Sequence, residues 1–80
     1  MKLWIGNLDP ATTDEELRQF LAKYSKLEIV SLVRVPGDGS RPGAVLEFGS
    51  ANSLAVYEAQ RRLHGMYWNK RELNVQVMRE

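Results

Sequence analysis

The 80-residue chain contains no cysteine, which excludes disulfides, zinc ribbons and thiol catalysis. It also has almost no excess charge, because 11 Lys and Arg residues oppose 10 Asp and Glu residues for a formal net charge of +1. A charge this small attracts anions only weakly, so any anionic partner must be held by individually placed side chains. The sequence shows neither a membrane-spanning apolar run nor a signal peptide. We therefore expect no membrane partner and an intracellular location, cytoplasmic in a bacterium and nuclear or cytoplasmic in a eukaryote.

Residues that carry catalysis are also scarce. His64 is the only histidine, and it precedes Gly65, which is expected to end a helix. No recognisable motif pairs His64 with a nucleophile. The acidic residues lack the spacing of a metal-binding loop, and no phosphate-binding glycine pattern occurs. We expect a protein without enzymatic activity, cofactor or metal, in which His64 is structural.

The remaining composition is that of an ordinary globular protein, with 44% hydrophobic and 26% charged residues. A chain this short buries only about 60 to 65% of its unfolded surface, which leaves no room for a second domain with its own site. We expect residues 1–80 to form one monomeric domain. Hydrophobic periodicity and turn signals predict strands that end at residue 7 and that span 27–35, 41–48 and 72–78, and helices over 14–24 and 53–63.

Local signals support the two helices. Thr13 precedes the first helix, and its hydroxyl can form a capping box with Glu16. The second helix has Ser50, Asn52 or Ser53 available as its cap.

Two short stretches carry the most information, and both alternate as strands do. In Leu3-Trp4-Ile5-Gly6-Asn7-Leu8, Leu3 and Ile5 face one side, and Trp4 faces the other side with Lys2 and Gly6. In the second stretch, 41–48, the alternation separates two sets. Ala44, Leu46 and Phe48 are expected to face the core, and Arg41, Gly43, Val45 and Glu47 the solvent.

These stretches resemble the hexamer and octamer motifs of the RNA recognition motif family. The hexamer matches well, and Trp4 occupies the position of the family's first stacking ring. The octamer departs from the pattern, because Pro42 replaces a glycine and Gly43 and Val45 replace aromatic rings. The resemblance covers nearly the whole chain. It implies an α+β fold, a ferredoxin-like βαββαβ sandwich with a four-stranded antiparallel sheet, two helices on one face and the other face open.

The resemblance also orients the strand over 27–35 and the end of the chain. It places Leu27, Val30 and Leu32 in the core, with a bulge near residues 28 and 29. In the last strand, Asn74 and Gln76 alternate outward onto the open face. Lys70 and Arg71, just before that strand, are interpreted as surface charges.

We interpret the open face as a surface for single-stranded RNA, whose unpaired bases can stack on rings and meet polar side chains. Trp4 is expected to stack a base and Val45 to add an apolar contact. Arg41 and Lys2 would meet phosphates, and the amides of Asn74 and Gln76 would contact base edges. Each of these residues also has a plainer interpretation, as cross-strand packing or as a solvated polar group.

A second interpretation is a protein-interaction module. Some related domains bind a peptide through the helical side, using an Arg-x-Phe motif just after the second helix. Here Met66 and Trp68 stand at the corresponding positions, and Trp68 is more simply a core residue. A protein partner near Tyr67 is the alternative expectation.

Overall fold

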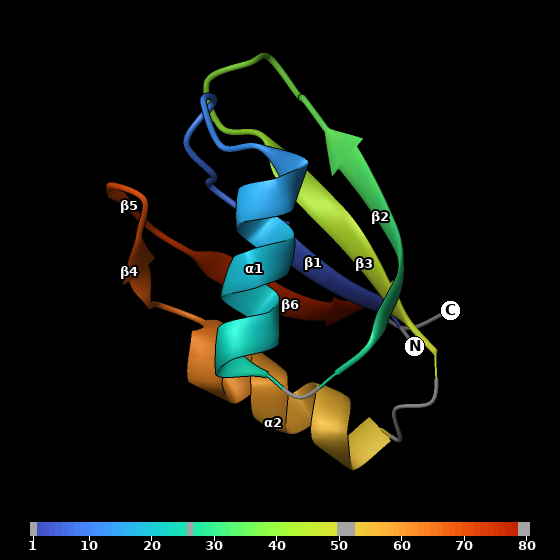
Figure 1. Cartoon of the computed structure of the whole chain (residues 1–80). Coiled ribbons are helices and arrows are strands. Elements are labelled where there is room, and N and C mark those ends of the chain that lie inside the picture. The colour runs from blue at the N-terminus through green and yellow to red at the C-terminus, as the bar shows by residue number, and fades with distance from the viewer. Residues whose placement is uncertain (1, 26, 50–52, 79–80) are drawn as a thin grey trace.

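The computed structural model describes residues 2–25, 27–49 and 53–78. The elements in chain order are β1 (Lys2–Gly6), α1 (Asp14–Tyr24), β2 (Ile29–Val35), β3 (Gly43–Phe48), α2 (Ser53–Leu63), β4 (Tyr67–Trp68), β5 (Arg71–Glu72) and β6 (Asn74–Met78). The antiparallel sheet has the strand order β2-β3-β1-β6, and both helices lie on one of its faces (Figure 1). The predicted α+β fold is confirmed, with the short β4–β5 hairpin as an addition.

The core lies between the sheet and the helices, where the inward side chains of β1, β3 and β6 meet those of α1 and α2. Leu3 and Ile5 of β1 are fully buried, as their alternation predicts. The core cluster consists of Leu3, Ile5, Leu8, Leu17, Phe20, Leu21, Ala44, Leu46, Val56, Leu63, Leu73 and Val75. Burial of this face is the main force that holds the layers together, at about 25 cal/mol per Å² of apolar surface.

The start of α1 follows the predicted capping box. The Glu16 backbone N–H donates to Thr13 Oγ1 at 3.1 Å, and the Thr13 backbone N–H donates to Glu16 Oε1 at 3.0 Å. These two bonds satisfy groups that have no partner within the helix. The cap therefore fixes where the chain turns from the β1–α1 connection into the helix.

Strand β2 differs from the prediction at Val30, which is 57% exposed instead of buried. The pairing with β3 shifts register between Ile29 and Ser31, so Val30 is the extra residue of a bulge. Ile29 packs against the core in its place, together with Leu27 and Leu32. The predicted bulge was one residue too early, and the strand begins at Ile29 instead of residue 27.

Other boundaries also moved. Strand β1 ends at Gly6, because Asn7 adopts a left-handed conformation with φ 61°. The predicted strand 72–78 is divided at Leu73, whose backbone bonds to the connection after α2: Gly65 N–H donates to Leu73 O, and Leu73 N–H donates to Met66 O, both at 2.9 Å. Leu73 thus lies between β5, which pairs with β4, and β6, which pairs with β1.

Helix α2 has the predicted bounds, and Gly65 beyond it has φ 81°, as a glycine that ends a helix should. Of the cap candidates, Ser50 and Asn52 lie outside the described residues. The end of α2 also covers the edge of β6. Gln60 Nε2 donates to Val75 O at 2.9 Å, and Val75 N–H donates to His64 Nδ1 at 3.0 Å, which confirms a structural role for His64.

Candidate nucleic-acid interface

The outward side chains of the four strands form three rows across the open face of the sheet. In the order β2, β3, β1 and β6, the rows are Ser31, Glu47, Lys2 and Met78; Val33, Val45, Trp4 and Gln76; Val35, Gly43, Gly6 and Asn74. Five of the six residues predicted for the site lie in these rows. The sixth, Arg41, is exposed in the connection just before β3.

Trp4 occupies the middle row and extends over two glycines. A Cβ atom built at Gly6 would lie 2.8 Å from Trp4 Nε1, and one built at Gly43 would overlap Trp4 Cζ2 and Cη2. The edge of the indole from Nε1 to Cη2 therefore covers the backbone of β1 and of β3. Gly43, which replaces an aromatic residue of the octamer, leaves the space that this ring fills.

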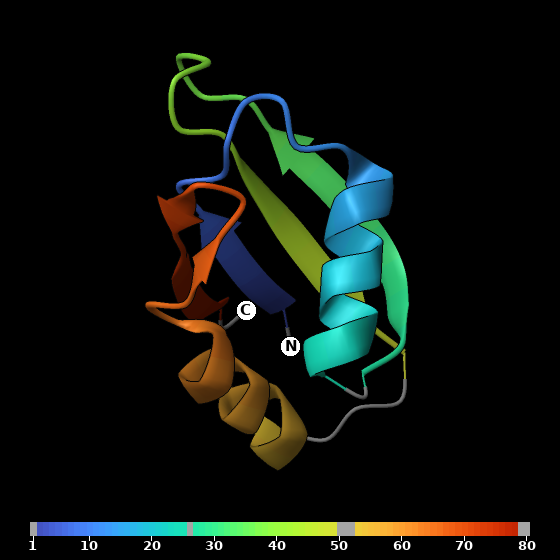
Figure 2. The same cartoon turned by 60° about the vertical axis from the view of Figure 1, so that its left-hand side comes forward.

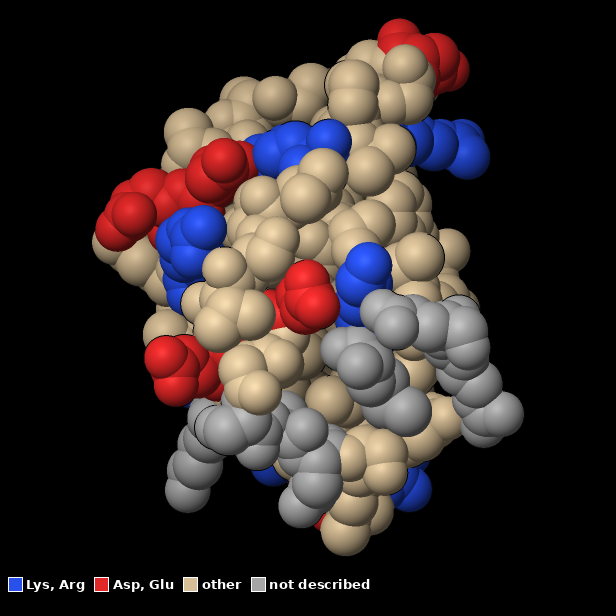
Figure 3. All heavy atoms as spheres, turned by 90° about the vertical axis from the view of Figure 1, so that its right-hand side faces the viewer, with Lys and Arg blue, Asp and Glu red and all other residues tan. Residues whose placement is uncertain are grey.

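The middle row of the face is apolar toward β2. Val45 lies directly between Trp4 and Val33, and Val33 is 55% exposed. Apolar side chains therefore continue the surface of Trp4 across two further strands. Figure 3 views the molecule from the right-hand side of Figure 1, where β2 forms the sheet edge, and shows acidic and basic side chains scattered among uncharged ones.

The charges on the face are few and of both signs. Lys2 and Glu47 are directly opposite each other on β1 and β3. Arg41 adds a positive charge near one end of the rows. The two cations suit phosphate contacts, whereas Glu47, which was not predicted to belong to the site, repels phosphates.

The two amides predicted to meet base edges lie next to each other on β6. Gln76 Nε2 donates to Asn74 Oδ1 at 3.0 Å, and both side chains are exposed. This bond leaves Gln76 Oε1 as an acceptor and Asn74 Nδ2 as a donor toward the solvent. Gln76 pairs with Trp4 and Asn74 with Gly6, so both amides lie on the strand next to the one that carries the indole.

Arg71, which was predicted to be a surface charge, is only partly exposed and makes contacts that were not predicted. Its Nη1 donates to Ser40 O at 2.7 Å, to Leu8 O at 3.4 Å and to Asn7 Oδ1 at 3.5 Å. The acceptors belong to two loops far away in the sequence, so no local pattern indicates this role. Two further bonds join the hairpin to the β1–α1 connection: Asn69 Nδ2 donates to Thr12 Oγ1, and Asn7 Nδ2 donates to Glu72 O, both at 2.8 Å (Figure 2).

The β2–β3 loop has its own internal order. The hydroxyl and the backbone N–H of Ser40 donate to Asp38 Oδ1 at 2.7 and 2.9 Å. These bonds, the hydroxyl bond first, hold the pKa of Asp38 below its ordinary value of 3.8. The carboxylate stays ionised at neutral pH and helps to shape the loop that leads to Arg41.

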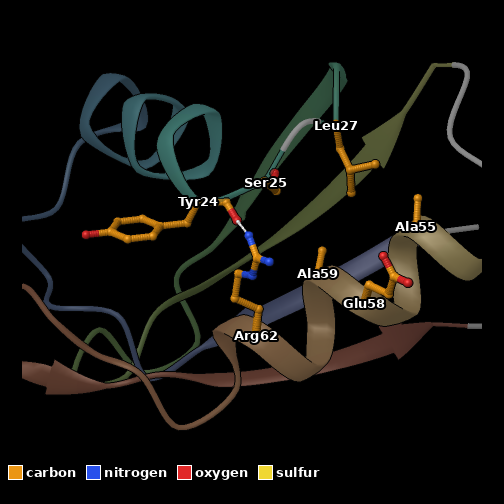
Figure 4. A pocket seen from close by; sticks show the side chains of 7 residues that line it. All are labelled: Tyr24, Ser25, Leu27, Ala55, Glu58, Ala59 and Arg62. Carbon is orange, nitrogen blue, oxygen red and sulfur yellow. Dashed lines mark hydrogen bonds between the residues drawn. The ribbon is translucent and has the colours of Figure 1, made fainter.

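Among the described residues, two shallow hollows lie on the helical side of the molecule. One, of about 360 Å³, lies between the end of α1 and α2, and Arg62 Nη1 reaches across it to Tyr24 O at 3.4 Å (Figure 4). The other, of about 350 Å³, lies between α1 and the hairpin. Its wall includes Trp68, which stacks on Phe20 with ring centroids 4.4 Å apart. The core position predicted for Trp68 is confirmed.

Comparisons with known proteins agree with this geometry. A solved structure described as "Pes4 RRM3 Structure" matches with a TM-score of 0.81 and 20% sequence identity, over 99% of this chain and 92% of that one. At this identity the likeness shows the fold alone. The chain has no significant match among curated protein sequences. No helix in the described parts of the chain is long and apolar enough to span a membrane.

The family comparison is more specific. The model of the RNA recognition motif matches residues 3–74, which include both motifs, both helices, β2 and β3 in full, and β1 from Leu3 onward. The chain belongs to the RNA recognition motif family, whose members are typically non-catalytic RNA-binding domains.

Proposed function

We propose that residues 1–80 act as one non-catalytic module that binds single-stranded RNA on the open face of the sheet. The observation that carries this proposal is the position of Trp4. Its indole lies in the middle row of the face, over Gly6 and Gly43, with exposed amides on one side and valines on the other. Bases must be unpaired to reach such a ring, and only single strands can expose them without breaking a duplex.

The neighbours of Trp4 suit different parts of a nucleotide. A base stacked on the indole would lie near the Asn74 and Gln76 amides, which can form hydrogen bonds with the polar groups on the edge of that base. Val45 offers an apolar contact for the next base or ribose. Arg41 and Lys2 lie near opposite ends of the face, where the phosphates on either side of a stacked base can meet them.

The affinity should be modest and only weakly dependent on salt. One stacked base contributes about 1 to 3 kcal/mol. With about two phosphate contacts, log K should fall by about 1.4 per decade of salt concentration on a single strand. Glu47 on the same face further limits the attraction of phosphates.

The test is a titration of the protein with labelled random-sequence RNA octamers, followed by fluorescence anisotropy and by amide shifts in NMR. Trp4→Ala should remove most of the binding while the fold persists. Tyr67→Ala is the matched control, because it removes a ring that is 73% exposed and lies in β4, outside the sheet that carries Trp4. The proposal fails if folded Trp4→Ala binds RNA as tightly as the parent.

A protein-interaction module is the second candidate, favoured by the exposed ring of Tyr67 and the hollows beside α1. Two observations count against the motif-based form of this candidate. Met66 and Trp68, which stand at the Arg-x-Phe positions, both pack against the core. A peptide partner would therefore have to use Tyr67 and the helix surfaces. Under this reading Tyr67→Ala weakens capture of the partner, and Trp4→Ala does not.

A further inference from the structure

Arg71 joins the hairpin to both loops at one end of the sheet. It lies in β5, and its Nη1 contacts Leu8 O and Asn7 Oδ1 in the β1–α1 connection and Ser40 O in the β2–β3 loop. Figures 1 and 2 show the hairpin beside the start of the β1–α1 connection, with the β2–β3 loop beyond it. The shortest of the three contacts, 2.7 Å, is the one to Ser40.

Ser40 immediately precedes Arg41, and the residue after Arg41 is also held. Leu8 N–H donates to Pro42 O at 2.9 Å. The backbone of Arg41 is thus fixed on both sides, by the Arg71 guanidinium before it and by the Leu8 amide after it. Gly43, which lies under the Trp4 indole, follows within the same stretch. The position of Arg41 relative to Trp4 therefore depends on the contact between Arg71 and Ser40.

We propose that Arg71 is a positioning residue for RNA binding: it holds the β2–β3 loop so that Arg41 meets the phosphate next to the base stacked on Trp4. This inference rests on the proposed function of the sheet face. A loop that is already ordered loses less conformational entropy when RNA binds. Arg71 can therefore strengthen RNA binding without contacting the RNA. The internal bonds of Asp38 shape the loop, and Arg71 fixes its place on the domain.

The geometry favours arginine at this position. All three contacts come from Nη1, which lies one bond farther from Cα than a lysine Nζ and is held by the planar guanidinium, whereas the lysine ammonium is a compact charge on a flexible stem. Arg71→Lys therefore keeps the charge and loses the positioning. This variant separates the proposed role from simple electrostatic attraction of RNA.

The experiment combines Arg71→Lys with Arg41→Ala in a double-mutant cycle, measured as RNA octamer affinity by anisotropy. Each single change should weaken binding about three- to tenfold, and the double variant should be little worse than Arg41→Ala alone, because Arg71 acts through Arg41. In the free protein, NMR order parameters of residues 38–41 should fall in Arg71→Lys. Lys70→Gln is the matched control, since it removes a neighbouring exposed charge and should leave both measurements nearly unchanged.

Several outcomes overturn the proposal. If Arg71→Lys binds RNA like the parent, the contacts to the loops do not matter for binding. If the two losses simply add, Arg71 acts on RNA independently of Arg41. If the RNA affinity of Arg71→Lys falls while the order parameters of residues 38–41 stay unchanged, Arg71 does not act by ordering the β2–β3 loop. If the parent protein itself binds no RNA, the proposed function is wrong. This outcome differs from a failure of the Arg71 proposal, because it is measured on the parent without any substitution.

Discussion

The indole of Trp4 covers the backbone of Gly43 on the neighbouring strand, at the octamer position where the family has an aromatic ring. The change to glycine therefore does more than remove a stacking surface. Any side chain at residue 43 would compete with Trp4 for the same space. The indole of Trp4 lies over two glycines and fills space that rings on two strands fill in other members of the family. The strands can therefore keep their positions although the aromatic residues of the octamer are absent.

Gly43→Ala should weaken both RNA binding and the fold. The new Cβ would overlap the indole and would lie 2.8 Å from Ile5 O, so both the ring and the strand must shift. We expect a loss of about 1 to 3 kcal/mol in the free energy of unfolding, as for other overpacked sites, measured by urea denaturation. In a Trp4→Ala background the cost should be smaller, because only the contact with Ile5 O remains. Equal costs in the two backgrounds would contradict the proposed overlap.

Val45→Phe should strengthen RNA binding. Val45 pairs directly with Trp4 and is only partly buried, so a ring there can extend the stacking surface toward β2. A gain of about 1 kcal/mol, or roughly fivefold in affinity, is at the lower end of the stacking range. Anisotropy with labelled RNA measures it, and circular dichroism checks that the variant folds. A folded variant with unchanged affinity would show that the β2 side of the face does not contact RNA.

Glu47→Gln should also raise RNA affinity, by removing a negative charge directly opposite Lys2. Exposed charge contacts are worth about 0.2 to 1 kcal/mol, so the gain should be up to about fivefold at low salt and should shrink as salt is added. Glu58→Gln, on α2, is the matched control because it changes the net charge equally on the helical side. Equal gains in both variants would mean that only net charge matters.

Lys70→Gly should stabilise the fold. Lys70 has φ 72° in the turn of the β4–β5 hairpin, a left-handed conformation that a side chain disfavours by about 1 to 2 kcal/mol. The greater freedom of glycine in the unfolded chain offsets part of this, leaving a net gain of about 0.5 to 1 kcal/mol. Thermal and urea unfolding measure it.

The neighbouring residue provides the comparison. Asn69 also has a positive φ, 53°, but its side chain donates to Thr12. Asn69→Gly loses this bond and should gain less than Lys70→Gly, or lose stability. A larger gain at Asn69 would contradict this account of the turn.

The fold was predictable from the sequence because its signals are local. The alternation of Leu3 and Ile5, the cap at Thr13 and the glycine after α2 each concern a few neighbouring residues. The same alternation placed Trp4, Val45, Asn74 and Gln76 on the open face. What these residues do there remains a prediction.

The errors come from contacts between distant segments. The residue that bulges out of β2 depends on the pairing with β3, and Ile29 and Val30 are both β-branched residues that suit a strand equally well. The role of Arg71 depends on a carbonyl oxygen at Ser40, 31 residues away. The direction of the Trp4 ring, over Gly6 and toward Gly43 on the next strand, cannot be deduced from strand alternation alone.

Gln60 and His64 have a consequence for how this protein behaves in concentrated solution. A sheet edge normally offers free backbone groups to which a strand of another molecule can add. At Val75 in β6, the carbonyl oxygen is already bonded to Gln60 of α2 and the N–H to His64, which directly follows this helix. On the opposite edge, the bulge at Val30 interrupts the regular spacing that an added strand would need. Edge-to-edge pairing of copies into fibres is therefore opposed by side-chain hydrogen bonds at one edge and by a bulge at the other. Substitutions at Gln60 or His64 should free the backbone groups of Val75 and make such pairing easier.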